Sequence, residues 1–157
     1  NIFEHPRLQA FMPQQLLDQK RRRMHVEEDD WNHIHNARAT KALSDAGVKV
    51  NNGAHGQLEG LGAHWEMWMM VQGGMSPMEA LRVSTINGAD YIGMSKDLGS
   101  ITTGKLADLV ILEKNPLDNI QNSESVVKVM LNGRLYDTTT LNEIVTGNRK
   151  RQPFWWQ

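Results

Sequence analysis

Two histidine-containing motifs are the first candidates for chemistry in this chain. His33-Ile34-His35 holds two imidazoles two residues apart, and His55 follows Gly53-Ala54 in a short glycine-containing stretch. Neutral imidazole ligates zinc and acts as a general base near neutral pH, so either motif can carry metal or proton chemistry. Two histidines at this spacing share a metal only on a strand, where they face the same side. On a helix they point about 200° apart.

Polar residues on both sides of His55 extend this candidate site. We expect Gln57 and Glu59, in the same stretch, to meet a substrate. His64 and Glu66 follow within one or two helical turns, and we expect them to line the mouth of a pocket or to orient His55. The competing interpretation is purely structural. In it His55 is a loop histidine held by backbone hydrogen bonds, and His64 and Glu66 contact a neighbouring element.

The elements that position these residues follow from apolar spacing and capping signals. Residues 31–46 predict a helix ended by Gly47, which places His33 and His35 on a helix and argues against their sharing a metal. Residues 48–51 predict a short strand, so His55 follows the carboxyl end of a strand. A second, mostly buried helix is expected over about 59–72, because its apolar residues recur on one face.

Strong local signals mark the elements that come next. Ser76-Pro77-Met78-Glu79 has the residues of a capping box with proline at the first helical position. Asn87 is expected to cap a further short helix. After Gly99 the spacing of apolar residues changes to the period typical of strands. Asn132-Gly133 predicts a type I′ hairpin turn. The expected strands cover residues 106–112, 126–131 and 134–136, with a last helical turn over 139–145. Residues 1–26 predict a long loop, with one helical turn around 14–19.

Composition limits the classes of protein that fit. The chain has 157 residues, of which 39% are hydrophobic and 22% charged, with a net charge of −1 and no cysteine. Disulfides and thiolate metal sites are therefore excluded, and the near-neutral charge argues against nucleic acid as a partner. No apolar run is long enough to span a bilayer, so we expect no membrane partner. The basic residues 149–151 are expected to be solvated, and Phe154, Trp155 and Trp156 to pack on a missing part of the protein or on a partner subunit. The compartment, cytoplasm or periplasm, stays open.

Four segments together carry a resemblance to a known family. The segments are residues 73–82, residues 85–89, the run Gly104-Lys105-Leu106-Ala107-Asp108-Leu109-Val110 and residues 132–134. In this order they resemble the closing part of an amidohydrolase of the imidazolonepropionase and prolidase-like type. The stretch around His55 most resembles members fused behind a β-propeller. In this family Asp108 and Lys105 lie in a hairpin away from the chemistry, and we expect both to be structural.

The resemblance implies an α/β fold. Residues 1–97 would form the last units of a (β/α)8 barrel after an N-terminal loop, and residues 98–157 the strands of a composite β-sandwich and a tail. A complete barrel takes about 250 residues, so this one would be incomplete. The family holds its metal with histidines, a lysine or glutamate, and an aspartate on strand eight. His55 stands where that aspartate is usual, which makes it the expected catalytic residue and a candidate ligand.

The implied activity is metal-dependent hydrolysis of carbon–nitrogen bonds, peptide bonds included, in a small-molecule or peptide substrate. The implied cofactor is a divalent metal, zinc, in the full-length protein. The alternative is a catalytically inert fragment or structural module of the same fold. Such a chain is expected to bind metal poorly and to self-associate through barrel surfaces that missing strands would otherwise cover. The expected protein partner is a second copy of the chain, in a homo-oligomer, or the missing N-terminal portion.

Overall fold

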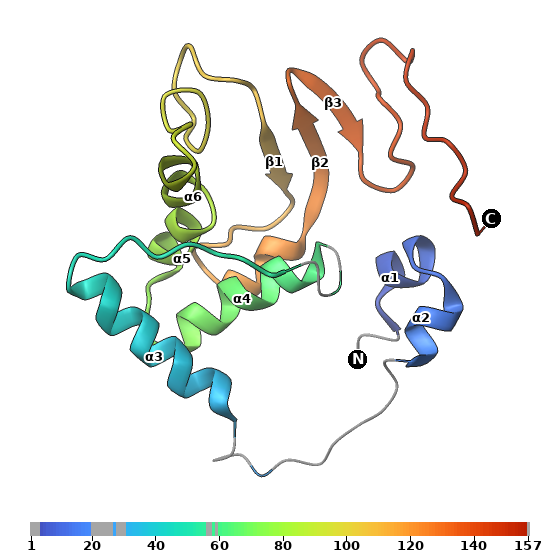
Figure 1. Cartoon of the computed structure of the whole chain (residues 1–157). Helices are drawn as coiled ribbons and strands as arrows, with labels where there is room; N and C mark the ends of the chain where they lie inside the picture. Colours follow the sequence, from blue (N-terminus) through green and yellow to red (C-terminus); the bar gives the residue numbers. More distant parts are fainter. Residues whose placement is uncertain (1–3, 20–26, 28–30, 56–57, 59, 157) are drawn as a thin grey trace.

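A computed structural model describes residues 4–19, 27, 31–55, 58 and 60–156 (Figure 1). Helices come first and a small sheet follows. The helices within the described residues are α1 (Pro6–Phe11), α2 (Gln14–Gln19), α3 (Asn32–Asp45), α4 (Leu61–Gln72), α5 (Pro77–Val83) and α6 (Ile86–Tyr91). The sheet contains β1 (Leu109–Leu112), β2 (Val126–Leu131) and β3 (Arg134–Asp137), and the 3-10 helix η3 (Ile120–Glu124) lies between the first two strands.

Helices α3 and α4 pack closely because glycine stands at their contact. A Cβ atom on Gly73 would lie 2.4 Å from the carbonyl carbon of Ala37, which is fully buried. The predicted helix over 31–46 is confirmed, and Gly47 follows it with φ +89°, in the left-handed conformation expected at such an end. Helix α4 buries four residues, as its apolar composition predicts: Leu61, Gly62, Met67 and Met70.

The capping box predicted for α5 is present. Ser76 Oγ accepts a hydrogen bond from the Glu79 amide at 3.3 Å, and Glu79 Oε2 accepts one from the Ser76 amide at 2.7 Å. The cap predicted for the next helix is wrong, because α6 begins after Thr85. Asn87 lies inside that helix and donates instead to the carbonyl oxygen of Val50 at 3.1 Å, a tertiary acceptor that local sequence does not reveal.

The sheet is antiparallel with strand order β1-β2-β3. Leu109 pairs with Met130, and Met130 pairs with Leu135 on its other side. Asn132 (φ 48°) and Gly133 (φ 74°) form the predicted turn between β2 and β3, since both adopt the positive φ of a type I′ hairpin. The first strand is shorter than the predicted 106–112.

Three expectations about local structure are wrong. Residues 48–51 form no strand in the described part of the chain, because helices supply their hydrogen-bond partners: the Val48 amide donates to Leu43 O of α3 at 3.0 Å, and Val50 O accepts from Asn87 of α6 at 3.1 Å. Residues 139–145 form no helical turn, since Glu143 makes an isolated bridge to Tyr136. The expected N-terminal loop contains α1, whose second turn is closed by the Met12 amide donating to Leu8 O.

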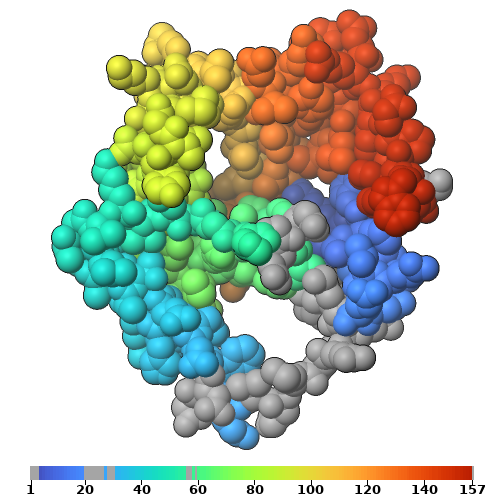
Figure 2. Space-filling view, in the orientation of Figure 1, coloured from blue at the N-terminus to red at the C-terminus, as the bar shows by residue number. Residues whose placement is uncertain are grey.

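Two clusters of buried side chains hold these elements together. The larger joins α4, α5 and η3 and contains Met67, Met70, Met75, Ala80, Val83 and Ile120. The smaller joins the N-terminal helices to the start of α4 and contains Leu8, Leu17, Leu58 and Leu61. Figure 2 shows the N-terminal helices beside the C-terminal segment, where Phe11 and Phe154 meet edge to face with ring centroids 6.1 Å apart. In the described residues, helices are too short or too polar to cross a bilayer.

Candidate functional site

His55 occupies an exposed turn between the segment that follows α3 and the start of α4. Its backbone has φ 52°, a left-handed conformation that is uncommon for residues other than glycine but is tolerated better by histidine, asparagine and aspartate. Gly60, which precedes α4, also has positive φ, at 79°. The chain therefore turns sharply on both sides of this loop and presents the imidazole to solvent.

The base of the loop is fixed by side chains on two helices. Glu66 Oε2, on α4, accepts a hydrogen bond from the Gly53 amide at 2.8 Å. Asn52 Nδ2 donates to Ala63 O at 2.9 Å and to Ser84 Oγ at 3.0 Å, which joins the loop to α4 and to the end of α5. The backbone two residues before His55 is therefore braced.

A buried leucine fixes the other side of the loop. Leu58 has φ 59° and is only 8% exposed, because its side chain packs in the smaller core cluster with Leu8 and Leu17. Apolar burial at this point stabilises a backbone conformation that is otherwise unfavourable for leucine. The N-terminal helices thus help to shape the loop that carries His55.

The imidazole of His64, on α4, contacts a serine of η3. Its Nδ1 lies 3.0 Å from Ser123 Oγ, which also accepts a hydrogen bond from Trp68 Nε1 at 2.9 Å. Burial lowers the pKa of His64, and the nearby charge of Glu124 opposes this shift while those of Arg7 and the neighbouring His5 assist it. The net shift keeps the His64 ring neutral at neutral pH.

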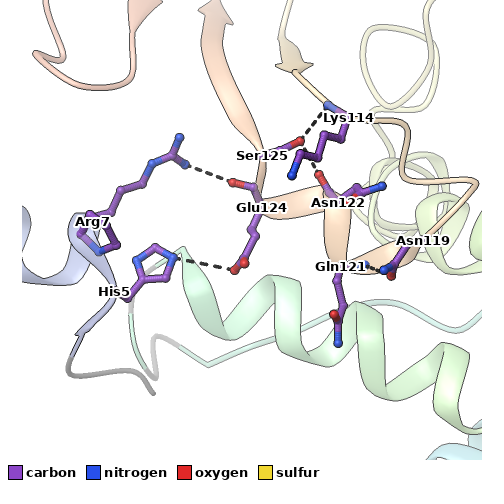
Figure 3. A pocket seen from close by; sticks show the side chains of 9 residues that line it. His5, Arg7, Lys114, Asn119, Gln121, Asn122, Glu124 and Ser125 are labelled. Carbon is purple, nitrogen blue, oxygen red and sulfur yellow. Dashed lines mark hydrogen bonds and ion pairs between the residues drawn. The ribbon is translucent and has the colours of Figure 1, made fainter.

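A cavity of about 620 Å³ opens beside His64, between α1, α4 and the sheet. Most of its wall is apolar and includes Leu8, Phe11, Met12, Leu61, Val126, Val129, Trp155 and Trp156. A second cavity, of about 430 Å³, is lined mostly by polar residue types (Figure 3). Both cavities are lined by His5, Arg7 and Glu124. Among the predicted site residues that the structure describes, His64 is the one that lines either cavity.

The remaining predicted roles have three outcomes. Glu66 is engaged by the backbone of the His55 loop, so its carboxylate braces that loop. Gln57 and Glu59 lie outside the described residues, and their roles stay predictions. Among the described contacts, no hydrogen bond joins His64 to His55, so an orienting role for His64 also stays a prediction.

A metal site does not form from the described residues alone. His33 and His35 lie on helix α3, as expected, and the His33 ring packs edge to face on Trp31 at 5.5 Å. Among the residues with described positions, no group of three histidine, aspartate or glutamate side chains lies close enough to hold an ion. His55 can therefore contribute at most one ligand to a site completed by other residues.

The two charged residues of the Gly104 to Val110 run have structural contacts. Asp108 Oδ1 accepts a hydrogen bond from the Asn132 amide at 2.6 Å, which ties the start of β1 to the hairpin turn. Lys105 Nζ donates to the carbonyl oxygen of Leu98 at 3.0 Å and to that of Ser95. The interpretation of both side chains as structural agrees with these contacts.

Sequence reasoning missed the residues that join the two cavities. Arg7 and His5 belong to a segment expected to be a loop, and Glu124 belongs to a short 3-10 helix that was not predicted. Pro6 at the first helical position was an available signal for α1. For Glu124 the sequence offers no signal, because its partners His5 and Arg7 are more than a hundred residues away along the chain.

Comparison with known proteins identifies the family of this chain. Residues 16–136 match the sequence profile of the amidohydrolase family. This chain belongs to the amidohydrolase family. Imidazolonepropionase of Shouchella clausii is 34% identical over 93 residues, which are 52% of this chain and 21% of that protein. Ochratoxinase of Aspergillus niger is 30% identical over 121 residues, or 74% of this chain and 25% of that protein.

Solved structures give the same relationship. A Xaa-Pro dipeptidase structure with bound methionine in its active site superposes with a TM-score of 0.59 at 32% identity and covers 64% of this chain. A putative prolidase from Bifidobacterium longum gives a TM-score of 0.55 at 27% identity and covers 76%. The chain spans 25% and 28% of these two proteins. It therefore corresponds to part of a TIM-barrel-type fold.

Proposed function

We propose that the protein to which this segment belongs hydrolyses carbon–nitrogen bonds in small-molecule or peptide substrates. Family membership supports the reaction class. The names of the relatives agree with it, since they include a deaminase, an imidazolonepropionase and a Xaa-Pro dipeptidase. The observation that carries the proposal for this chain is the exposed imidazole of His55 on a braced loop.

We further assign parts of the chain to parts of the family fold. Residues 1–97 would supply the last units of a (β/α)8 barrel, and residues 98–157 would supply strands of a composite β-sandwich with a C-terminal tail. The change from helices to an antiparallel sheet after α6 supports a division near residue 97. On this assignment the loop around His55 leaves the carboxyl end of the last barrel unit, the position where barrel enzymes carry catalytic residues.

The role proposed for His55 is proton transfer. A histidine with a neutral ring accepts a proton from an attacking water at one imidazole nitrogen and returns it to the leaving nitrogen of the substrate. The hydrogen bond between Glu66 and the Gly53 amide limits backbone motion beside His55, so the ring is presented in a restricted set of positions. His64 and the loop residues Gln57 and Glu59 are proposed to contact the substrate.

The cofactor proposed is a divalent metal, zinc. When bound, such an ion polarises the substrate carbonyl and lowers the pKa of its water to about 7. Because the described residues form no complete metal site, the remaining ligands would come from residues outside them. The usual aspartate is replaced by His55, so an imidazole nitrogen would stand in for a carboxylate oxygen.

The test uses the complete protein with zinc and a panel of Xaa-Pro dipeptides and cyclic amides. His55→Ala should lower kcat by about 10²–10⁴-fold, the usual loss for a general base. His35→Ala is the matched control, since His35 is an exposed histidine on α3, and it should leave kcat unchanged. Wild-type kcat in the His55 variant would exclude the proposed role.

An inert, self-associating module is the second candidate, and exposed apolar side chains favour it. Leu43 is 53% exposed, Val48 is 50% exposed and Val110 is 60% exposed. Metal analysis and sedimentation of both the 157-residue chain and the complete protein separate the two proposals. Stoichiometric zinc with amide hydrolysis by either would exclude the inert module, whereas a complete protein without metal or activity would support it.

A further inference from the structure

The two adjoining cavities have complementary chemistry. The 620 Å³ cavity is walled mostly by aliphatic and aromatic side chains, and the 430 Å³ cavity by polar ones. Both volumes fall within the range of about 300–1,000 Å³ that is typical of small-molecule sites. Since the two share His5, Arg7 and Glu124, they form one site with an apolar chamber and a polar chamber.

The charges of this double site favour an anion. Arg7 and Lys114 are permanent cations in its wall, and Glu124 is the one carboxylate among its lining residues. That carboxylate lies 3.8 Å from His5 Nε2, so an imidazole already faces it. With neutral histidines the lining carries two positive charges and one negative charge, a net excess of +1. Figure 3 shows Arg7 and Lys114 on opposite sides of Glu124.

The hydrogen-bond acceptors of Arg7 among the described residues are uncharged oxygen atoms. Its guanidinium donates to the carbonyl oxygens of Glu124, at 3.5 Å, and of Val126, and to Thr138 Oγ1 at 3.5 Å. These bonds orient the group at the junction of the two chambers but do not neutralise it. Among the described contacts both Nη2 hydrogens are occupied by these bonds, so the second Nη1 hydrogen and the Nε hydrogen are the donors left for a carboxylate.

The apolar chamber favours a ligand whose carboxylate is attached to an apolar group. Phe11, Trp155 and Trp156 supply aromatic surface at one end, and Val126 and Val129 of β2 supply aliphatic surface. An unbranched hydrocarbon tail gains about 0.8 kcal/mol for each methylene buried against such a wall. The polar chamber adds three side-chain amides that can donate to a carboxylate: Asn119, Gln121 and Asn122.

We propose that this double cavity binds an amphipathic monocarboxylate, with its tail in the apolar chamber and its carboxylate between Arg7 and Lys114. The site uses residues from α1, α4, η3, the strands and the C-terminal segment, and of these the proposed reaction involves His64. His55 is not among the residues that line either cavity.

The test titrates the 157-residue chain with octanoate, octanol and octyltrimethylammonium, using calorimetry and tryptophan fluorescence. Octanoate should bind at one molecule per chain and about tenfold more tightly than octanol, the ratio expected for a charge-assisted hydrogen bond. The cation should bind more weakly than either. Equal affinity for octanoate and octanol, or no saturable binding of octanoate, would overturn the proposal.

A matched pair of lysine variants tests the position of the carboxylate. Lys114→Gln should weaken octanoate binding about tenfold and leave octanol binding unchanged, because it removes one cationic donor. Lys96→Gln, at an exposed lysine that lines neither cavity, should leave both affinities unchanged. Equal effects of the two variants on octanoate binding would refute the placement. Lys114 is itself exposed, so its replacement is not expected to disturb folding.

Discussion

Replacing Ser123 with alanine tests the contact that joins α4 to η3. Ser123 is 3% exposed, and its hydroxyl is bonded to Trp68 Nε1 and to His64 Nδ1. The Ser123→Ala variant leaves both ring nitrogens without this partner. Leaving a buried polar group unpaired costs about 1–3 kcal/mol. Since both rings are only partly buried, we expect about 1 kcal/mol for each, and a total loss of about 2 kcal/mol.

The measurement is urea unfolding followed by tryptophan fluorescence. For a slope m of about 2 kcal/mol per molar urea, the expected loss shifts the midpoint by about 1 M. Ser100→Ala is the control, because the Ser100 hydroxyl is exposed and bonds only to the Thr102 hydroxyl at 3.2 Å among the described contacts. The control variant should unfold within about 0.5 kcal/mol of the wild type.

A double-mutant cycle separates the hydrogen bond from other effects of the substitution. Trp68→Phe removes the donor but keeps a ring in place, so it should reduce the cost of Ser123→Ala by about 1 kcal/mol. Strict additivity of the two substitutions would refute the hydrogen bond between Trp68 and Ser123. A loss below about 0.5 kcal/mol in Ser123→Ala alone would refute the reasoning as a whole.

The remaining predictions concern packing, capping and pH. Gly73→Ala should destabilise the chain by about 3 kcal/mol or more in urea unfolding, because its Cβ would overlap the Ala37 backbone, whereas Gly88→Ala, with open space around it, should not. The Ser76→Ala variant, which removes the N-cap of α5, should lower the free energy of unfolding by about 1 kcal/mol in the same assay. Hydrogen bonds to its carboxylate, of which the one from the Thr146 side chain contributes most, lower the pKa of Glu143 from 4.5 to about 2. The folded state therefore favours the ionised carboxylate of Glu143, so the free energy of unfolding should fall as pH drops from 4.5 toward 2. The Glu143→Gln variant should show a weaker dependence on pH in an acid titration followed by circular dichroism.

Local signals in the sequence were sufficient for several elements. The capping box at Ser76, the left-handed end at Gly47 and the turn at Asn132-Gly133 were all predicted, since each depends on interactions within a few residues. Strand β2 was predicted with its observed bounds, because its apolar residues are continuous and a turn signal follows them. The family resemblance was likewise confirmed by residues 16–136.

Tertiary contacts decided what the local signals could not. The segment before His55 was expected to be a strand, but Asn87 supplies one of its hydrogen-bond partners from a helix. The role of Glu66 depended in the same way on which backbone amide its carboxylate reaches, and that amide is 13 residues away. Such pairings depend on the path of the chain in three dimensions.

The sequence by itself determined the family, the main helices and the hairpin, and it drew attention to His55. Only the tertiary structure showed that Leu58 and Glu66 brace the loop of that histidine, and that His64 bonds with Ser123. It also brought Arg7 beside Glu124, 117 residues apart, to form the junction of the two cavities. Caps and turns are encoded by neighbouring residues, whereas cavities and charge clusters form where distant segments meet, and so the double site became visible only in the folded chain.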